Sequence, residues 1–305
     1  MPYLLLSLAA VFWGGNYVAG NILVEYINPY ALSVFRWGFT TLLIFSVYRR
    51  VIFTQWGMLC ENFKMNFVFS LLGQVCFPLT LYIGLQHTSS LNASIYISST
   101  PCLVLLINAL FFKEKISLRN IIGVIVSTFG VLYLAFSNSV SGELENFGMG
   151  DVFTILSALS WAFYCALLRF KDKRVSNTAF VGFNSLIGTI ILIVIYIVYS
   201  VFSSNVVVFV QKPSLLPVLG LIYLVVFPSW LSYVFWSKGV QLIGTTRSEI
   251  FTHVIPVSGG ILSIALLNEK FHTYHSISLL FIIIGIIFCS GNMKFNFRNS
   301  TQDRL

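Results

Sequence analysis

The sequence has 305 residues, of which 57% are hydrophobic and only 9% are charged, and its formal net charge is +8. Soluble globular proteins carry about 25% charged residues, so this composition excludes a soluble domain, a disordered chain, a collagen and a coiled coil. The 18 lysines and arginines stand in small groups between apolar runs, which is typical of topology signals in a membrane protein and not of a nucleic-acid-binding surface.

The apolar runs are long and nearly uninterrupted, as in residues 190–202 and 276–290. This pattern favours transmembrane helices over the short alternating strands of a membrane barrel. Clusters of polar residues, prolines and glycines divide the chain into ten predicted spans, at residues 3–24, 29–48, 66–85, 91–112, 119–137, 150–168, 178–202, 216–237, 246–267 and 276–292. The sequence therefore predicts an all-α integral membrane protein with ten transmembrane helices.

The distribution of basic residues predicts the orientation of these spans. With the N-terminus in the cytoplasm, fifteen of the eighteen basic residues fall in cytoplasmic segments, among them Lys171 and Arg298. The external segments keep only Lys212 and Lys270, and the longest of them carries acidic residues such as Glu145. We therefore expect a multi-pass protein of the plasma (inner) membrane with both termini in the cytoplasm.

The second half of the chain repeats features of the first. A shift of 155 positions aligns residues 84–130 with residues 239–285 without a gap, and a shift of 148 aligns Trp13 with Trp161 near the front of each half. The positions that coincide under the first shift include Gly84 with Gly239, Gln86 with Gln241, Pro101 with Pro256, Glu114-Lys115 with Glu269-Lys270 and Gly130 with Gly285. These are not the interchangeable aliphatic residues that would match by chance, so we interpret them as an internal repeat.

An odd number of spans in each half inverts the second half relative to the first. The predicted five-helix repeats are residues 1–148 and 149–293, followed by a short cytoplasmic tail at residues 294–305. Two oppositely oriented copies can exchange conformations, which makes an inward-open and an outward-open state nearly equal in energy. Inverted repeats of this kind are typical of secondary transporters that work by alternating access.

At this point the chain resembles the drug/metabolite transporter superfamily and, within it, the ten-span EamA-type permeases. The residues that carry the resemblance are Trp13-Gly14-Gly15-Asn16, Arg36, Pro101, Glu114-Lys115-Ile116-Ser117 and Gly123 in the first half, and Trp161, Pro256 and Glu269-Lys270 in the second. The resemblance implies two pseudo-symmetric halves around a central cavity, peripheral fifth and tenth spans, and transport of small organic solutes such as amino acids, nucleosides, sugar derivatives or drugs. Ser278 departs from the pattern at the position that matches Gly123, where a larger side chain is expected to weaken the packing of span ten.

Arg36 and Asn16 are the first candidate solute-binding residues. Arg36 falls about 10 Å deep in the second span, at about 1.5 Å per residue, where a charge needs a partner or a water-filled cavity. Its planar fork of donors can clamp a carboxylate or phosphate, although it can also snorkel outward or bind backbone carbonyls. Asn16 follows Gly14 and Gly15, which allow close approach, so its amide can bind a solute or a neighbouring helix.

Span four carries polar residues before a proline. Asn92, Tyr96, Ser99 and Thr100 are spaced so that they share one helical face immediately before Pro101. Polar groups beside the carbonyls that a proline frees are typical of a binding wall, and we predict that Asn92, Tyr96 and Ser99 bind solute. The alternative is hydrogen bonding between packed helices.

The matching part of span nine carries an ionisable pair. Glu249 and His253 stand four residues apart before Pro256, and this spacing places them on one face of an α-helix. We predict that the pair couples proton movement to transport, with Pro101 and Pro256 as gating positions, since such groups in a partly dry cavity can titrate near physiological pH. The alternatives are an ion pair of Glu249 with Arg247 and a neutral, hydrogen-bonded His253.

Aromatic residues of spans six and eight complete the predicted site. The rings of Trp161, Tyr164 and Trp230 can stack on an aromatic or apolar solute, although they can equally serve packing or the lipid interface. The sequence contains no Walker loop, nucleophile elbow or zinc-protease motif, so we expect no enzyme activity.

The sequence predicts no metal site and no cofactor. The five cysteines show no C-x-x-C spacing. Glu269, His272 and His275 are spaced three apart, which three zinc ligands could use, but Glu269 is already explained by the repeat.

The leading hypothesis is a secondary active transporter or exchanger of a small organic metabolite, an amino acid or a similar compound, acting by alternating access around a central cavity. Its partners are then the solute and the lipid bilayer, with proton coupling, and the protein acts as a monomer or a homodimer. A multidrug or toxic-metabolite exporter of the same fold is an alternative. A channel, or a membrane scaffold or sensor that transports nothing, is the alternative of a different class.

Overall fold

The computed structural model describes residues 2–113, 117–137, 148–203, 208–211, 215–243 and 248–290, and every structural statement below concerns these residues. The predicted Glu114-Lys115 pair, residues Arg247 and Lys212, and the tail at 294–305 lie outside them. Nearly all of the described residues are helical, and an isolated antiparallel bridge joins Ile27 to Phe209.

The helices follow one another in the order that the apolar runs predict. The first half contains α1 (Pro2–Val24), α2 (Pro29–Thr54), α3 (Trp56–Glu61), α4 (Phe63–Ser70), the π-helical segment η1 (Leu71–Cys76), α5 (Phe77–Leu85), α6 (Ser90–Ile97), α7 (Thr100–Phe112) and α8 (Leu118–Ser137). The second half contains α9 (Met149–Leu167), the 3₁₀ segment η2 (Leu168–Phe170), α10 (Asn177–Phe202), α11 (Leu215–Leu224), the π-helical segment η3 (Val225–Leu231), α12 (Ser232–Ile243), the 3₁₀ segment η4 (Glu249–His253), α14 (Val254–Leu267) and α15 (Thr273–Ser290).

Eight helical stretches of the described chain are long and apolar enough to cross a membrane, from Pro2–Val24 to Leu215–Val240. Two shorter apolar helices, Phe251–Leu267 and Thr273–Phe288, stand where the sequence predicts the ninth and tenth spans. The prediction of an all-helical membrane protein is therefore confirmed.

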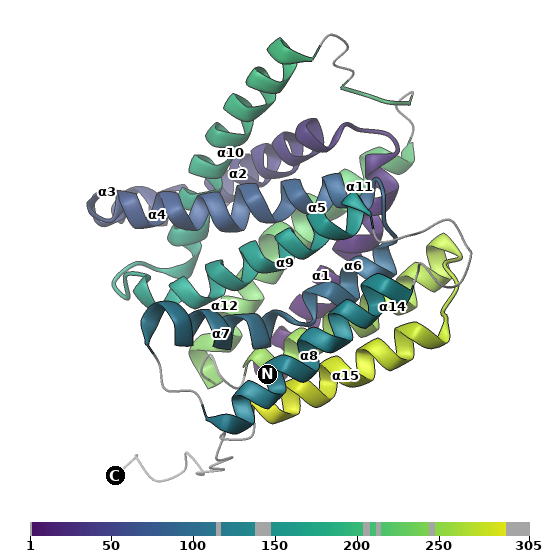
Figure 1. The fold of residues 1–305 in the computed structure, drawn as a ribbon. Coiled ribbons are helices and arrows are strands. Elements are labelled where there is room, and N and C mark those ends of the chain that lie inside the picture. Colours follow the sequence, from purple (N-terminus) through teal and green to yellow (C-terminus); the bar gives the residue numbers. More distant parts are fainter. Residues whose placement is uncertain are drawn as a thin grey trace, which may run out of the picture.

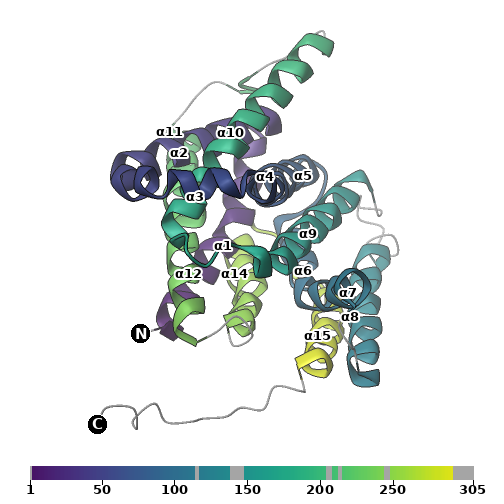
Figure 2. The same ribbon diagram turned by 90° about the vertical axis from the view of Figure 1, so that its left-hand side faces the viewer.

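The helices form one bundle, with a pair of packed helices on each of two opposite sides (Figures 1 and 2). Along one edge α8 packs against α15, and α2 packs against α10 on the opposite side of the bundle. Between them α1 contacts α11, α12 and α14, while α9 contacts α5, α6 and α7. The first helix of each half is thus surrounded by helices of the other half, and the centre of the bundle lies along α1 and α9.

Glycines set the distance between α8 and α15. A Cβ added at Gly285 would lie 2.5 Å from the carbonyl oxygen of Gly123, and one added at Gly130 would lie 2.9 Å from that of Ser278. Ser278 is fully buried, and its hydroxyl donates a hydrogen bond to the Gly130 carbonyl at 2.7 Å. The expectation that Ser278 weakens this packing is wrong, because the hydroxyl satisfies a backbone acceptor where the sequence suggested only added bulk.

This close contact leads to a stability prediction. Gly285→Ala should lower the unfolding free energy by about 1–3 kcal/mol, because the added methyl group meets the backbone of α8 and forces the helices apart. Gly57→Ala is the matched control, since nothing lies within 4 Å of a Cβ at Gly57 in α3. Thermal unfolding in detergent measures both variants, and equal melting temperatures would contradict the close packing of α8 and α15.

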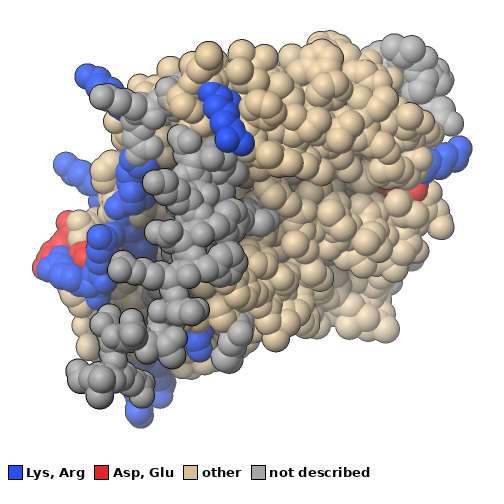
Figure 3. Space-filling model, turned by 90° about the horizontal axis from the view of Figure 1, so that it is seen from below, with Lys and Arg blue, Asp and Glu red and all other residues tan. Residues whose placement is uncertain are grey.

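The surface separates charged ends from an uncharged middle. Figure 3 shows most of the visible lysine and arginine side chains at one end of the molecule, next to a wide surface without charged residues in this view. Large apolar side chains are exposed along α8 and α10, such as Leu118, Ile125, Ile197 and Val201. A belt of this kind fits contact with lipid acyl chains.

Candidate functional site

Arg36 lies in the middle of the bundle with neutral partners only. Its side chain is 1% exposed, Nε donates to the Ser229 hydroxyl at 2.7 Å, and Nη1 donates to the Tyr82 hydroxyl at 2.6 Å. Among the described residues, no carboxylate contacts the guanidinium. A buried cation without a counter-ion is costly, so this position favours an anionic ligand.

Hydroxyl and amide groups extend the polar surroundings of Arg36. The Tyr82 hydroxyl donates a long hydrogen bond to Oδ1 of Asn16, at 3.5 Å. The guanidinium carbon lies 5.4 Å from the centre of the Trp37 ring, in the geometry of a cation–π contact. Asn16 therefore lies near Arg36, with the Tyr82 hydroxyl between the two side chains. Neither Ser229 nor Tyr82 was predicted, although Ser229 follows Pro228, which marks a break in span eight.

An aromatic cluster adjoins this polar group, and four of its members are Trp13, Trp161, Tyr164 and Tyr233. Trp161 meets Trp13 edge-to-face at 5.7 Å between ring centres and stacks on Tyr164 at 5.0 Å. Tyr233 contacts Trp13 at 5.8 Å and Trp37 at 6.0 Å, which joins the aromatic cluster to the surroundings of Arg36. The predicted residues Trp161 and Tyr164 thus lie together.

Trp230 stands apart from these rings. It contacts Tyr48 of α2 edge-to-face at 6.3 Å. Its buried indole nitrogen has no hydrogen-bond partner among the described residues. A solute group could therefore accept a hydrogen bond from it.

The two π-helical segments present backbone carbonyls to the centre. Trp13 donates from Nε1 to the Pro228 carbonyl in η3 at 3.0 Å, and Ser160 of α9 donates to the Leu72 carbonyl in η1 at 2.9 Å. π-Helical segments leave carbonyls outside the regular ladder and occur frequently at functional sites. Here they let α1 and α9 bind neighbouring helices through those carbonyls.

The polar residues of α6 are engaged with other helices. Oδ1 of Asn92 lies 3.1 Å from Nε2 of His275 in α15, and the Tyr96 hydroxyl donates to Asp151 of α9 at 3.0 Å. Ser99 donates to the Tyr96 carbonyl at 2.8 Å. The structure therefore does not bring these three residues to Arg36, and their bonds correspond to the alternative of contacts between packed helices.

Glu269 caps the start of α6. One of its carboxylate oxygens accepts from the amide and hydroxyl of Ser90 at 3.0 and 2.8 Å, and the other accepts from the amide of Leu91 at 3.0 Å. A carboxylate at this place stabilises the positive end of the helix. The acidic residue that the repeat singles out thus joins the end of span nine to the beginning of span four.

The helix breaks lie where the prolines predict them. α6 ends at Ile97 and α7 begins at Thr100, directly before Pro101, while the 3₁₀ segment η4 runs into α14 two residues before Pro256. The backbone from Glu249 to His253 is a 3₁₀-helix, where the sequence predicted an α-helix. His253 is half-buried, and the side chain of Glu249 lies outside the described structure.

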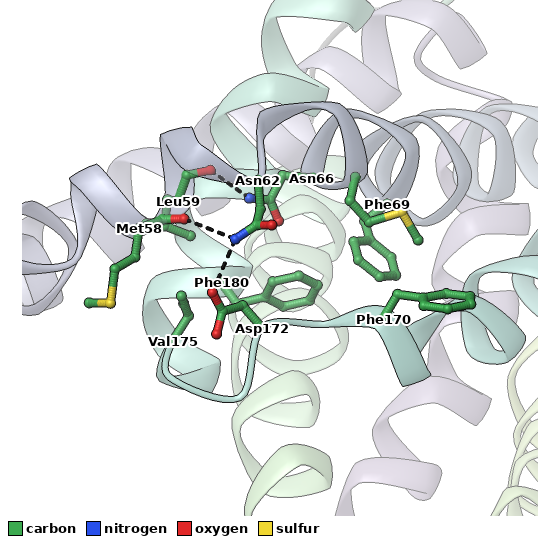
Figure 4. Close-up of a pocket in the computed structure, with 10 residues that line it drawn as sticks. Met58, Leu59, Asn62, Asn66, Phe69, Phe170, Asp172, Val175 and Phe180 are labelled. Atoms are coloured by element: carbon green, nitrogen blue, oxygen red, sulfur yellow. Dashed lines mark hydrogen bonds between the residues drawn. The ribbon is translucent and has the colours of Figure 1, made fainter.

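Figure 4 shows a small recess at one end of the bundle, between α3, α4 and the loop before α10. Arg174 binds Asp172 at 2.7 Å and Glu61 at 3.1 Å, and Asn62 donates to Asp172 at 3.0 Å. Hydrogen bonds from Arg174 lower the pKa of Asp172 to about 2, and burial lowers the pKa of Lys171 to about 8. None of the predicted solute-binding residues lines this recess, so it is not the central site.

The family model of the EamA-like transporters matches residues 1–136 and again residues 148–291. Similar proteins include two uncharacterized transporters of Bacillus subtilis. YyaM is 24% identical over 96% of this chain and 94% of its own length. YetK is 25% identical over 93% of this chain and 85% of its own length. A WAT1-related chloroplastic protein of Arabidopsis thaliana is 26% identical over 90% of this chain and 66% of its own length.

A solved structure shares the fold with a TM-score of 0.59 at 15% identity, covering 93% of this chain and 94% of that one. The fold is therefore one that an experimental structure also adopts. The family model accounts for most of both halves. The chain belongs to the EamA-like transporter family, a family of membrane transporters.

Proposed function

We propose that the protein is a secondary active transporter or exchanger that moves a small organic metabolite, an amino acid or a similar compound with a carboxylate, by alternating access. The observation that carries this proposal is the buried Arg36, whose partners Ser229 and Tyr82 are both neutral. A solute carboxylate would supply the missing counter-charge through a bidentate pair. Asn16, Trp161, Tyr164 and Trp230 would then contact the rest of the solute.

Paired features of the two halves support ten spans in two inverted repeats, residues 1–148 and 149–293. The π-helical segments Leu71–Cys76 and Val225–Leu231 nearly coincide under the shift of 155 residues. The same shift relates Lys113 and Asn268, the two non-glycine residues with positive φ among the described residues, both at 54°. Helix irregularities that recur 155 residues apart indicate that the two halves share one architecture.

Contacts between helices are paired in the same way. The contact of α1 with α14 corresponds to that of α9 with α7, and the contact of α1 with α12 corresponds to that of α9 with α5. The pairs α2 with α10 and α8 with α15 each join equivalent helices of the two halves. This pattern is the one expected of two related units around a pseudo-two-fold axis.

The aromatic cluster favours a second candidate function, export of drugs or toxic metabolites by the same fold. Trp13, Trp161, Tyr164 and Tyr233 offer ring faces and edges to an apolar or aromatic solute. A solute without a negative charge would not use Arg36. Thermal-shift screening of the purified protein separates the two candidates, because a ligand that binds the folded state raises its melting temperature.

The screen uses L-amino acids, small carboxylates, nucleosides and cationic aromatic dyes. The amino-acid proposal expects stabilisation by one or more carboxylate-bearing compounds, and the exporter alternative expects it by the dyes. Stabilisation by dyes alone would contradict the proposed role of Arg36.

Cysteine labelling in intact cells tests the proposed orientation, with both termini in the cytoplasm of the plasma membrane. Single cysteines near Lys64, Lys171 and Arg298 should be shielded from an impermeant maleimide, while those near Glu145 and Lys212 should react. This follows from the gathering of basic residues on one side. Finding positions 145 and 171 on the same side would overturn the inverted ten-span arrangement.

A further inference from the structure

A second buried polar pair lies between η1 and α10. Gln74 and Asn184 are both 0% exposed. A Cβ added at Gly188, one turn after Asn184 on the same face of α10, would lie 2.6 Å from Cβ of Gln74, so both residues belong to the interface of η1 with α10. Among the described residues, neither the oxygen nor the nitrogen of either amide has a hydrogen-bond partner.

Such a pair is unfavourable for stability. Buried amides without partners lose the hydrogen bonds that they make with water, so folded proteins bury few of them. Leucine would fill a similar volume without this loss. Gln74 nevertheless occupies this place in a π-helical segment, and Gly188 leaves room for its side chain. A ligand that binds the amide would explain this arrangement.

The repeat relates this pair to the Arg36 site. Asn184 follows Arg36 by 148 residues, and Ser229 follows Gln74 by 155 residues, which are the two shifts that align the halves. Arg36 and Ser229 are hydrogen-bonded between α2 and η3. The amides of Asn184 and Gln74, between α10 and η1, thus occupy the equivalent place in the other half.

The helices α2 and α10 cross where Thr41 contacts Thr189. Thr41 and Thr189, themselves 148 residues apart, share a hydrogen bond of 3.1 Å. As α10 proceeds from Gly182 to Thr189, its contacts on α2 run back from Ile52 to Thr41, so the two helices are antiparallel.

Arg36 and Asn184 therefore lie on opposite sides of this crossing, and Gln74 lies beside it, against Gly188. Arg36 and Asn184 each stand five residues before their threonine on antiparallel helices, which separates them by about 15 Å along the helix axes. The Gln74 and Asn184 pair therefore extends from the level of the crossing away from Arg36, as a second polar position on the same path.

Aromatic rings connect the two positions. A Cβ added at Gly73, the neighbour of Gln74, would lie 2.8 Å from the Tyr164 ring. Tyr164 stacks on Trp161, which contacts Tyr233 at 6.2 Å between ring centres. Tyr233 in turn contacts Trp37 beside Arg36, so the aromatic cluster extends from one polar site to the other.

We propose that Gln74 and Asn184 form a second solute site, which binds a neutral hydrogen-bonding group of the transported metabolite, such as a hydroxyl or carboxamide, at the helix crossing and on its side away from Arg36. The inference rests on the proposed carrier function. Amides both donate and accept hydrogen bonds but carry no charge, so this site holds the neutral part of the solute and Arg36 holds the carboxylate.

Cysteine accessibility tests whether the pair lies on the transport path, and the test needs no identified solute. Gln74→Cys, Asn184→Cys and Asn16→Cys are prepared in a variant that keeps exposed Cys60 as its only native cysteine. Reaction with 2-aminoethyl methanethiosulfonate is followed by intact-mass spectrometry. Ser127→Cys is the matched control, because Ser127 is also buried without a partner among the described residues but lies in the peripheral contact of α8 with α15.

We expect the cysteines at positions 74 and 184 to react about 10- to 1,000-fold more slowly than Cys60, since minor open states are typically populated at about 0.1–10%. Ser127→Cys should stay unmodified. Reaction of Asn16→Cys without reaction at positions 74 and 184 would overturn this inference and leave the Arg36 site standing. No reaction at positions 16, 74 and 184 would overturn the proposed carrier function as well. Equal reaction at position 127 would show that the labelling reports general unfolding, and it would remove the support for the site.

Stability provides a second, independent readout. Gln74→Leu and Asn184→Leu should each raise the melting temperature of the solute-free protein by several degrees, because each removes two unpartnered buried polar atoms. A lower melting temperature in both variants would identify the amides as structural groups and overturn the proposal.

Discussion

Replacing Arg36 by lysine or by alanine is expected to weaken solute binding by at least about tenfold, and by up to about a hundredfold for alanine, since charge-assisted hydrogen bonds contribute about 1.5–3 kcal/mol. Lysine keeps the charge but loses the planar fork that holds a carboxylate at two points. It also cannot reach Ser229 and Tyr82 with the same two donors. Binding of the solute identified by thermal shift, measured at matched folded levels, provides the comparison.

Arg50→Lys is the control for this change. Arg50 lies on the same helix, α2, but it is exposed at its end. The control should bind as the wild type does. Unchanged affinity in both Arg36 variants would make Arg36 a structural residue, held by its neutral hydrogen bonds alone.

Glu249→Gln and His253→Ala are expected to abolish accumulation driven by a pH gradient while leaving exchange of solute intact. With one proton per neutral solute, each pH unit across the membrane supports about a tenfold concentration ratio, and a variant that cannot take up the proton loses it. The asymmetry between the halves supports a single proton site, since Ser94 and Ser98 stand at the positions of span four that match the pair. Uptake into vesicles with an imposed pH gradient measures the effect.

Glu25→Gln and His87→Ala are matched controls, because both residues are exposed in turns between helices. They should accumulate solute as the wild type does. If the pH gradient has no effect on the wild type, or if the Glu249 and His253 variants respond normally, the pair has no proton role and transport is exchange without a proton.

Much of the fold could be predicted from the sequence, because the physical signals are local. Long apolar runs mark the spans, and prolines mark the breaks at Pro101 and Pro256. The all-helical membrane character is confirmed for the described residues. The details of the breaks, such as the 3₁₀ segment before Pro256, could not be predicted, since α-helical and 3₁₀ spacing differ by less than one residue per turn.

The candidate site was predicted only in part. Arg36 and Asn16 could be recognised because a polar group in an apolar span is energetically costly and therefore indicates a specific partner or a binding site. Tyr82 and Ser229 could not, since a tyrosine and a serine in a membrane span are common and only the packing of distant helices brings them to Arg36. Asn92 and Tyr96 have the right spacing on one face, but that face meets His275 and Asp151.

Counterflow in proteoliposomes tests the carrier function most directly. Vesicles are loaded with an unlabelled solute that stabilises the purified protein and are then diluted into a trace of the same solute in labelled form. A carrier with a central site takes up label transiently above its equilibrium level, because outgoing solute drives the exchange. A channel would only equilibrate the label, and a scaffold or sensor would leave it outside; either result, with folded protein in the vesicles, would contradict alternating access around Arg36.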